Sequence, residues 1–174
     1  MNKRIHFILT ILLLAISCQQ KKDATKNTIV ENTKEIEVVT LDYKALKPYL
    51  SRKDDKTYVV NFWATWCVPC VKELPAFEKL YANYKDNNVE VLLVSLDFPK
   101  QVEESLIPFM RKHNLQATVL HFVDNDEQFW IKDIAESWTG SIPATLIYNT
   151  KERKFFEHTF NYEELQKELQ TFLN

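Results

Sequence analysis

The chain has 174 residues, 45% of them hydrophobic and 26% charged, and its formal net charge is -2. These values favour one globular domain with terminal extensions, and they provide no general attraction to nucleic acid or anionic lipid. Gly140 is the only glycine, which excludes glycine-rich phosphate loops and dinucleotide-binding motifs. The three cysteines, Cys18, Cys67 and Cys70, are too few for a small disulfide-stapled protein.

Residues 1–17 form a short basic and apolar leader. Lys3 and Arg4 precede the apolar stretch 5–16, which is shorter than the ~20 residues that a membrane-spanning helix needs. The run Leu-Ala-Ile-Ser-Cys that ends at Cys18 resembles a bacterial lipobox. This resemblance implies cleavage before Cys18 and acylation of its sulfur and of the new amino end, which would hold the chain to a membrane. An uncleaved signal anchor is the alternative.

Residues 18–35 are polar, charged and nearly free of large apolar side chains. Such a segment buries too little surface to offset the entropy of ordering it, so we expect a flexible tether. The globular domain is therefore expected over residues 36–174.

Strands and helices are predicted to alternate through that domain. Composition and apolar runs predict strands at residues 37–41, 57–62, 89–96, 118–123, 144–148 and 155–160. Apolar spacing predicts helices after Asp42, after residues 67–70, over 102–113, over 126–138 with Asp124 or Asn125 as cap, and after Asn161. Pro108 should kink or split the third of these helices. Together the elements predict an α/β layer fold of about 140 residues.

Cys67 and Cys70 form a Cys-x-x-Cys motif between a predicted strand and the helix that follows it. The first cysteine of such a motif lies at the helix N-terminus, where unpaired N–H groups and the helix dipole stabilise its thiolate, the form that attacks disulfides. Cys70 lies one turn further on, close enough to close a disulfide with Cys67. Pro69 has no backbone N–H to donate, but N–H groups of the first helical turn have no partner within the helix, so little is lost. Its fixed φ stiffens the loop. The motif therefore predicts a redox-active pair.

Two other interpretations of this pair stay open. A structural zinc site needs four ligands, and His113, His121 and His158 are scattered singly, so no metal site is predicted. A purely structural disulfide is the second, although a bridge that closes so few residues constrains little of the unfolded chain.

Residues 61–75, NFWATWCVPCVKELP, strongly resemble the thioredoxin superfamily, and within it the membrane-tethered TlpA-like or ResA-like envelope branch. Residues 141–145, Ser-Ile-Pro-Ala-Thr, are similar to the loop of this family that carries a cis-proline facing the Cys-x-x-Cys motif. The resemblance covers nearly all of residues 36–174. It implies a thioredoxin-like α/β fold with a central mixed β-sheet flanked by helices, an N-terminal extension and a helix-containing insertion.

The resemblance also implies roles for individual residues. Cys67 would be the attacking nucleophile and Cys70 the resolving thiol, and the reaction would pass through a mixed disulfide with the substrate. Pro143 would be cis, and Ile142 would offer backbone hydrogen bonds to a bound substrate strand. Trp66 is expected to shield the disulfide and to line the substrate groove.

Glu73 is expected on the same helical face as Cys70, one turn along. In the envelope branch, an acid at this position lies near the active site and tunes the thiols. Our hypothesis is that Glu73 exchanges protons with Cys70 or disfavours thiolates by charge repulsion, and a solvated surface glutamate is the alternative. Asn61 stands where cytosolic thioredoxins carry a buried aspartate, which makes Glu73 or water more plausible as the proton acceptor.

The resemblance implies a thiol–disulfide oxidoreductase of the bacterial cell envelope, anchored by lipid on Cys18 and facing the periplasm. The favoured direction is reduction of disulfide-containing proteins such as an apocytochrome, with a membrane thiol protein as electron donor. No cofactor and no nucleic-acid partner are expected, and a monomer is the default. The alternatives are a thiol oxidase or disulfide isomerase, a thiol peroxidase and a non-catalytic adaptor. Peroxiredoxin-like sites have a threonine three residues before the reactive cysteine, whereas Thr65 lies two before Cys67.

Overall fold

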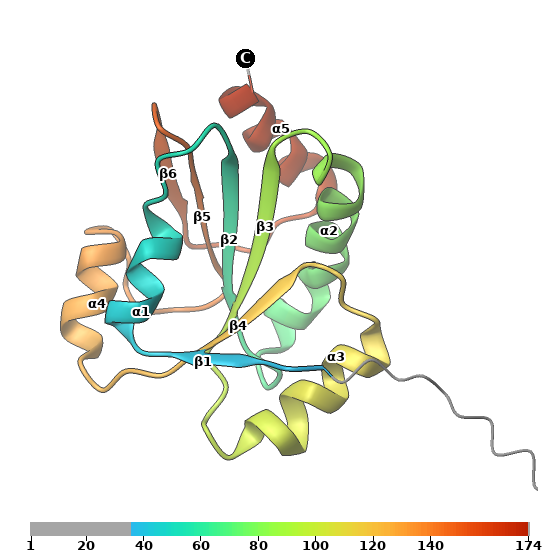
Figure 1. Ribbon diagram of the computed structural model, residues 1–174, viewed down its shortest axis with the longest axis vertical. Coiled ribbons are helices and arrows are strands. Elements are labelled where there is room, and N and C mark those ends of the chain that lie inside the picture. Colours follow the sequence, from blue (N-terminus) through green and yellow to red (C-terminus); the bar gives the residue numbers. More distant parts are fainter. Residues whose placement is uncertain (1–35, 174) are drawn as a thin grey trace, which may run out of the picture. The chain divides into compact units, whose positions relative to one another are not determined.

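The computed structural model describes residues 36–173 (Figure 1). The predicted signal peptide and tether, and with them Cys18, lie outside the described residues. The strands are β1 (Val39–Leu41), β2 (Thr57–Trp63), β3 (Val89–Ser95), β4 (Thr118–Phe122), β5 (Ala144–Tyr148) and β6 (Arg153–Phe156). The α-helices are α1 (Tyr43–Leu46), α2 (Val68–Tyr84), α3 (Ile107–His113), α4 (Glu127–Ile134) and α5 (Tyr162–Leu173). A 3₁₀ turn, Lys47–Leu50, continues α1.

The strands form one mixed sheet in the order β1-β4-β3-β2-β5-β6. The pairings β1–β4, β4–β3 and β3–β2 are parallel, whereas β5 and β6 run antiparallel to their neighbours. β2 lies inside the sheet, and all seven of its residues are buried. A strand covered on both faces reads as a continuous apolar run, which is why the TYVVNFW sequence of β2 shows no polar alternation. The predicted mixed sheet is confirmed.

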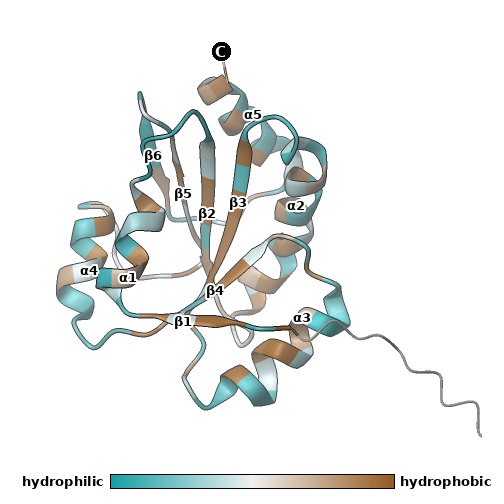
Figure 2. Cartoon of the chain, in the orientation of Figure 1, coloured by the Kyte–Doolittle hydropathy of each residue, from teal (hydrophilic) through white to brown (hydrophobic). Residues whose placement is uncertain are grey.

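Alternate residues of β2 belong to two separate apolar cores. Figure 1 shows the helices that flank the sheet, and Figure 2 shows that β3, beside β2, is largely hydrophobic. Val59 and Trp63 belong to the core on one face, together with apolar side chains of α2, α3 and α5. Tyr58, Val60 and Phe62 belong to the core on the other face, with side chains of α1 and α4. This alternation follows from the two-residue period of a strand. Side chains of β2 pack in both cores. The end of this strand is therefore held firmly and can position the loop that follows it.

The region between β3 and β5 contains α3, β4 and α4, and β4 joins the sheet between β1 and β3. The predicted helix over residues 102–113 is split, as expected, into a π-helical turn, Val102–Leu106, and α3. Pro108 is the second residue of α3 and directly follows the π-helical turn; its missing N–H cannot continue an α-helical hydrogen-bond pattern from that turn. Within residues 36–173, no helix is both long and apolar enough to cross a membrane.

The prediction of a helix over residues 126–138 was wrong at both ends. α4 is capped by Asp126, whose Oδ1 accepts a 3.3 Å hydrogen bond from the N–H of Phe129. Asp124 cannot serve as that cap because its carboxylate binds the N–H of Tyr43 at 3.0 Å. The helix ends at Ile134, and Ala135 has extended backbone. Local apolar spacing continued to Trp138, but this residue belongs to the loop that returns towards the sheet.

The last predicted strand, residues 155–160, was placed too late in the chain. β6 is Arg153–Phe156, in register with β5 so that Phe155 pairs with Leu146 and Phe156 with Thr145. The chain leaves the sheet after Phe156, and the N–H of Phe160 donates instead to a side chain of α2. The aromatic run was therefore only partly strand, because a tertiary contact competes for its backbone.

Candidate active site

Cys67 is the N-terminal capping residue of α2, directly after the turn that follows β2. Its Sγ accepts a 3.3 Å hydrogen bond from the N–H of Cys70, and its carbonyl accepts from the N–H of Val71 at 3.0 Å. The sulfur therefore lies against the exposed N–H groups of the first helical turn. That position stabilises a negative sulfur, as the sequence predicted.

A neighbouring loop holds the turn before Cys67. Both carboxylate oxygens of Asp97 accept from the N–H of Thr65, at 3.2 and 3.1 Å, and Oδ1 also accepts from the Thr65 hydroxyl at 2.5 Å. The hydroxyl of Ser95 donates to the same carboxylate at 2.8 Å. Asp97 is only 2% exposed. A buried carboxylate with this many donors fixes the path of the chain into the Cys-x-x-Cys motif.

Cys67 and Cys70 are joined by a disulfide with an S–S distance of 1.98 Å. Both cysteines are buried, but Cys70 is completely so, whereas Cys67 has an exposed fraction of 5%. Of the two sulfur-bearing residues, Cys67 is therefore the more accessible. Within residues 36–173, no three His, Cys, Asp or Glu side chains are grouped so as to hold a metal ion.

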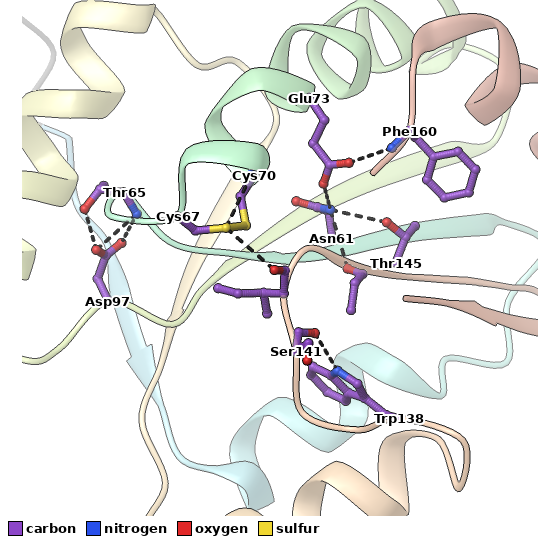
Figure 3. The surroundings of a disulfide bond; sticks show 12 residues. Asn61, Thr65, Cys67, Cys70, Glu73, Asp97, Trp138, Ser141, Thr145 and Phe160 are labelled. Carbon is purple, nitrogen blue, oxygen red and sulfur yellow. Dashed lines mark hydrogen bonds between the residues drawn. A yellow bond between two sulfur atoms is a disulfide. The ribbon is translucent and has the colours of Figure 1, made fainter. Parts of the chain in front are cut away.

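The cis-proline loop faces this disulfide (Figure 3). The Ile142–Pro143 peptide bond is cis, as expected from the resemblance. The carbonyl oxygen of Ile142 lies 3.8 Å from Sγ of Cys67. The structure thus brings together residues that are 75 positions apart in the sequence. An extended polypeptide lying along Ile142 would place its own sulfur next to Cys67.

Glu73 is buried, with an exposed fraction of 2%, so the alternative of a solvated surface glutamate was wrong. Its Oε1 accepts from Nδ2 of Asn61 and its Oε2 from the N–H of Phe160, each at 2.8 Å. Burial raises the pKa of Glu73 to about 7, although these two hydrogen bonds and the nearby His158 act in the opposite direction. A carboxyl with this pKa can both give and take a proton near neutral pH.

Asn61 connects Glu73 to the strand that follows the cis-proline. Its Nδ2 also donates to Oγ1 of Thr145 at 3.2 Å and contacts the carbonyl of Ala144 at 3.4 Å. Its Oδ1 is buried without a hydrogen-bond partner among the described residues. Figure 3 shows this oxygen on the side of Asn61 that faces the Cys67–Cys70 bond. The polar groups behind the disulfide are therefore held by one amide.

Trp66 lies on the surface beside the disulfide, 50% exposed, and its ring is stacked with that of Phe98 at a centroid distance of 6.2 Å. Both rings border a cavity of about 460 Å³. The cavity reaches the cis-proline loop at Ile142 and α4 at Trp130 and Ile131. The expected position of Trp66 at the rim of a groove is consistent with this arrangement.

Sequence reasoning missed several residues of this site. They are Asp97, which holds the active-site turn, Phe98, which stacks on Trp66, and Thr145, which binds Asn61. Asp97 directly follows a buried strand, and a polar residue in that place could have been a signal. Phe98 has no local pattern that marks it. Thr145 is the last residue of the cis-proline motif, but nothing in that motif indicates that its hydroxyl binds Asn61.

A disulfide at a helix N-terminus, opposite a cis-proline loop and above a buried acid, defines the class of thiol–disulfide oxidoreductases with a thioredoxin-like fold. The family model described as "AhpC/TSA family" matches residues 31–153. The chain belongs to this family.

Individual relatives agree with that class. Thiol-disulfide oxidoreductase ResA of Geobacillus kaustophilus is 27% identical over 169 residues, which cover 94% of this chain and 91% of the relative. ResA of Oceanobacillus iheyensis is 38% identical over 96 residues, which cover 55% of this chain but only 45% of the relative. The crystal structure of StoA from Bacillus subtilis matches with a TM-score of 0.52 and 25% identity, over 68% of this chain and 84% of StoA.

Proposed function

We propose that the protein reduces disulfides of other proteins in the bacterial cell envelope, with Cys67 and Cys70 as its redox couple. One observation carries the proposal: the disulfide lies at the N-terminus of α2 and joins the capping cysteine, which keeps some exposure, to a completely buried one. This asymmetry suits an attacking thiol and a resolving thiol. It does not suit a purely structural bridge, which needs neither access nor a stabilised thiolate.

The reaction consists of two exchanges of sulfur–sulfur bonds. In the reduced enzyme, the Cys67 thiolate attacks one sulfur of the substrate disulfide, which forms a mixed disulfide and releases the other substrate sulfur as a thiolate. Cys70 then attacks Sγ of Cys67, so the intramolecular disulfide forms and the second substrate sulfur leaves. Two electrons have passed to the substrate. A thiol protein of the membrane would return the enzyme to its dithiol form.

Glu73 is the proposed proton acceptor for Cys70. The resolving step requires Cys70 to lose its proton while it is buried, and Glu73 is the acid one helical turn further along the same helix. Its pKa of about 7 allows the carboxylate to take that proton near neutral pH. The hydrogen bond from Asn61 would keep the carboxylate in place in both redox states.

Trp66, Ile142 and Pro143 are the proposed substrate-binding residues. An extended substrate segment would pair with the backbone at Ile142, as a strand adds to a sheet edge, while Trp66 covers its side chains. The 3.8 Å between the Ile142 carbonyl and Sγ of Cys67 supports this arrangement, because a substrate sulfur beside Ile142 is then within reach of Cys67.

The leader sequence supports a place of action in the cell envelope. The resemblance of the residues before Cys18 to a lipobox supports lipid anchoring at that cysteine, with the domain facing the periplasm. A monomer is the default expectation. The relatives named ResA support a thiol–disulfide oxidoreductase of this kind. Its substrate would be a disulfide-containing protein, and an apocytochrome is one candidate.

The equilibrium reduction potential of the Cys67–Cys70 couple tests the direction of electron flow. A value near about −270 mV, as in thioredoxin, or lower supports a reductase, whereas a value near about −120 mV, as in DsbA, supports an oxidase. Purified protein would be equilibrated in thiol buffers and followed by tryptophan fluorescence, with Cys67→Ser as the redox-inactive control. A thiol peroxidase would instead turn over hydrogen peroxide; we expect none, because Asp97 engages the Thr65 hydroxyl.

A further inference from the structure

Glu157 follows β6 and binds the loop that leads into the cis-proline. Its carboxylate accepts hydrogen bonds from the N–H of Thr139 at 3.0 Å, from the hydroxyl of Thr139, and from the N–H of Ser141 at 3.1 Å. Glu157 takes part in none of the ion pairs found within residues 36–173. The hydrogen-bond donors of this carboxylate, Thr139 and Ser141, are thus in one loop.

A second contact holds the same loop through a carbonyl group. Nε1–H of Trp138 donates a 2.9 Å hydrogen bond to the carbonyl of Ser141 (Figure 3). Trp138 is completely buried between the sheet and α4, so its indole is a fixed point. Ser141 is therefore tied through its N–H to Glu157 and through its carbonyl to Trp138. The next residue is Ile142.

These contacts are needed because the loop has no regular structure to hold it. Gly140 has a φ of +95°, a left-handed conformation that permits the turn between the two residues bound by Glu157. Hydrogen bonds to a charged acceptor are stronger than those between neutral groups. Although burial by itself would raise the pKa of Glu157, the donors of Thr139 and Ser141 keep that pKa below its usual range, so the carboxylate is charged at neutral pH.

We propose that Glu157 is a positioning residue for substrate binding: by clamping Thr139 and Ser141, it holds the Ile142 backbone in the conformation that pairs with a substrate polypeptide. This inference rests on the proposed function and deepens it. The Glu157 carboxylate binds Thr139 and Ser141, so it acts on the affinity for protein substrates and not on the sulfur chemistry. Small disulfides without a peptide backbone should not depend on it.

The test compares Glu157→Gln with wild type, using the full chain. The amide keeps the size of the side chain but turns an NH₂ group towards N–H donors, which breaks part of the clamp. Pre-reduced enzyme would be mixed with excess insulin, and its oxidation followed by tryptophan fluorescence. We expect the half-saturating insulin concentration to rise about tenfold, with the maximal rate unchanged, as the loss of hydrogen bonds to one charged group implies.

Three further measurements separate positioning from general damage. The reduction potential and the rate of oxidation by hydroxyethyl disulfide should be unchanged in Glu157→Gln. Glu152→Gln, an exposed glutamate in the β5–β6 turn, is the matched control and should behave as wild type in every assay. Thr139→Val removes the hydroxyl that contacts Glu157 and Ser141 Oγ but keeps both N–H donors of the clamp, and it should show a smaller rise in the half-saturating concentration.

Amide hydrogen exchange at Ser141 provides a test of the loop contacts that does not depend on enzyme activity. Protection of this N–H should fall in Glu157→Gln and remain in Glu152→Gln. If wild-type protein reduced no insulin, the proposed function would be wrong. The exchange data would still show whether Glu157 holds the loop at Ser141. An unchanged half-saturating concentration in Glu157→Gln, unchanged protection at Ser141, or an equal loss of reactivity towards hydroxyethyl disulfide would each overturn the inference.

Discussion

Nδ2 of Asn61 donates a 2.8 Å hydrogen bond to Oε1 of Glu73, and both residues are buried, with exposed fractions of 0% and 2%. The amide comes from the central strand and the acid from the active-site helix. The bond therefore links the sheet to the helix that carries Cys67 and Cys70. It also holds a titratable group in a buried place, where a change of its protonation state alters the stability of the fold.

The pH dependence of stability should reveal the buried acid. The pKa of Glu73 is about 7 in the folded protein and 4.5 for an ordinary glutamate. The folded state thus binds the proton more tightly, so the contribution is fully present below pH 4.5 and is lost as the pH rises through 7. The loss is on the order of 3 kcal/mol in the free energy of unfolding.

In Glu73→Gln this dependence should disappear. Urea unfolding at pH 5 and pH 8 would measure it, with Glu163→Gln, an exposed glutamate on α5, as the control that keeps the wild-type slope. The variant should also lose the inflection near pH 7 in its rate of disulfide reduction. Parallel stability curves for Glu73→Gln and wild type would contradict the assignment of a raised pKa.

Alkylation should distinguish the two thiols. Cys67 caps the helix N-terminus and has an exposed fraction of 5%, whereas Cys70 is completely buried. In the reduced protein at neutral pH, iodoacetamide should therefore modify Cys67 at least about tenfold faster than Cys70. Mass spectrometry of peptides from partly alkylated protein measures the ratio. Faster modification of Cys70 would reverse the proposed roles of nucleophile and resolving thiol.

Truncation of Trp66 should weaken the binding of protein substrates with little effect on the stability of the fold. This side chain is half exposed and stacks with Phe98, so Trp66→Ala removes apolar surface at the rim of the groove with little loss of core packing. We expect the half-saturating insulin concentration to rise about fivefold to tenfold and the free energy of unfolding to change by less than about 1 kcal/mol. Phe129→Ala, at an aromatic residue 55% exposed on α4, is the control and should leave the kinetics unchanged. Equal effects of the two substitutions would argue against a specific role for Trp66.

Removal of the Asp97 carboxylate should loosen the active-site turn. Asp97→Ala leaves the N–H of Thr65 and the hydroxyl of Ser95 without their acceptor, at a cost of about 3 kcal/mol in the free energy of unfolding. Asp97→Asn retains one oxygen and should lose less. Urea denaturation measures both, with the exposed Asp86→Ala as control. A loss under about 1 kcal/mol in Asp97→Ala would show that water replaces the carboxylate easily.

Much of the architecture could be predicted because its signals are local. The β-branched run before the Cys-x-x-Cys motif indicates a buried strand, and Asp42 and Asn161 cap the helices that follow them, as expected. The disulfide could be anticipated in the same way, since two cysteines three residues apart meet within one helical turn. Such features depend on neighbours along the chain, and neighbours are visible in a sequence.

The contacts that define the site chemically could not be predicted in this way. Glu73 accepts a hydrogen bond from Phe160, which is 87 residues away in the sequence. Asp97 accepts one from Thr65, which is 32 residues away. The helical period predicts that Glu73 lies on the same helix face as Cys70. Whether that face is exposed to solvent or buried depends on which distant segments pack against it. Desolvation and hydrogen bonding set the pKa of a carboxyl, and both arise only once those segments are in place. The Cys67–Cys70 pair could thus be predicted from the sequence. The buried surroundings of Glu73 and the hydrogen bonds of Glu157 to the cis-proline loop exist only in the folded molecule.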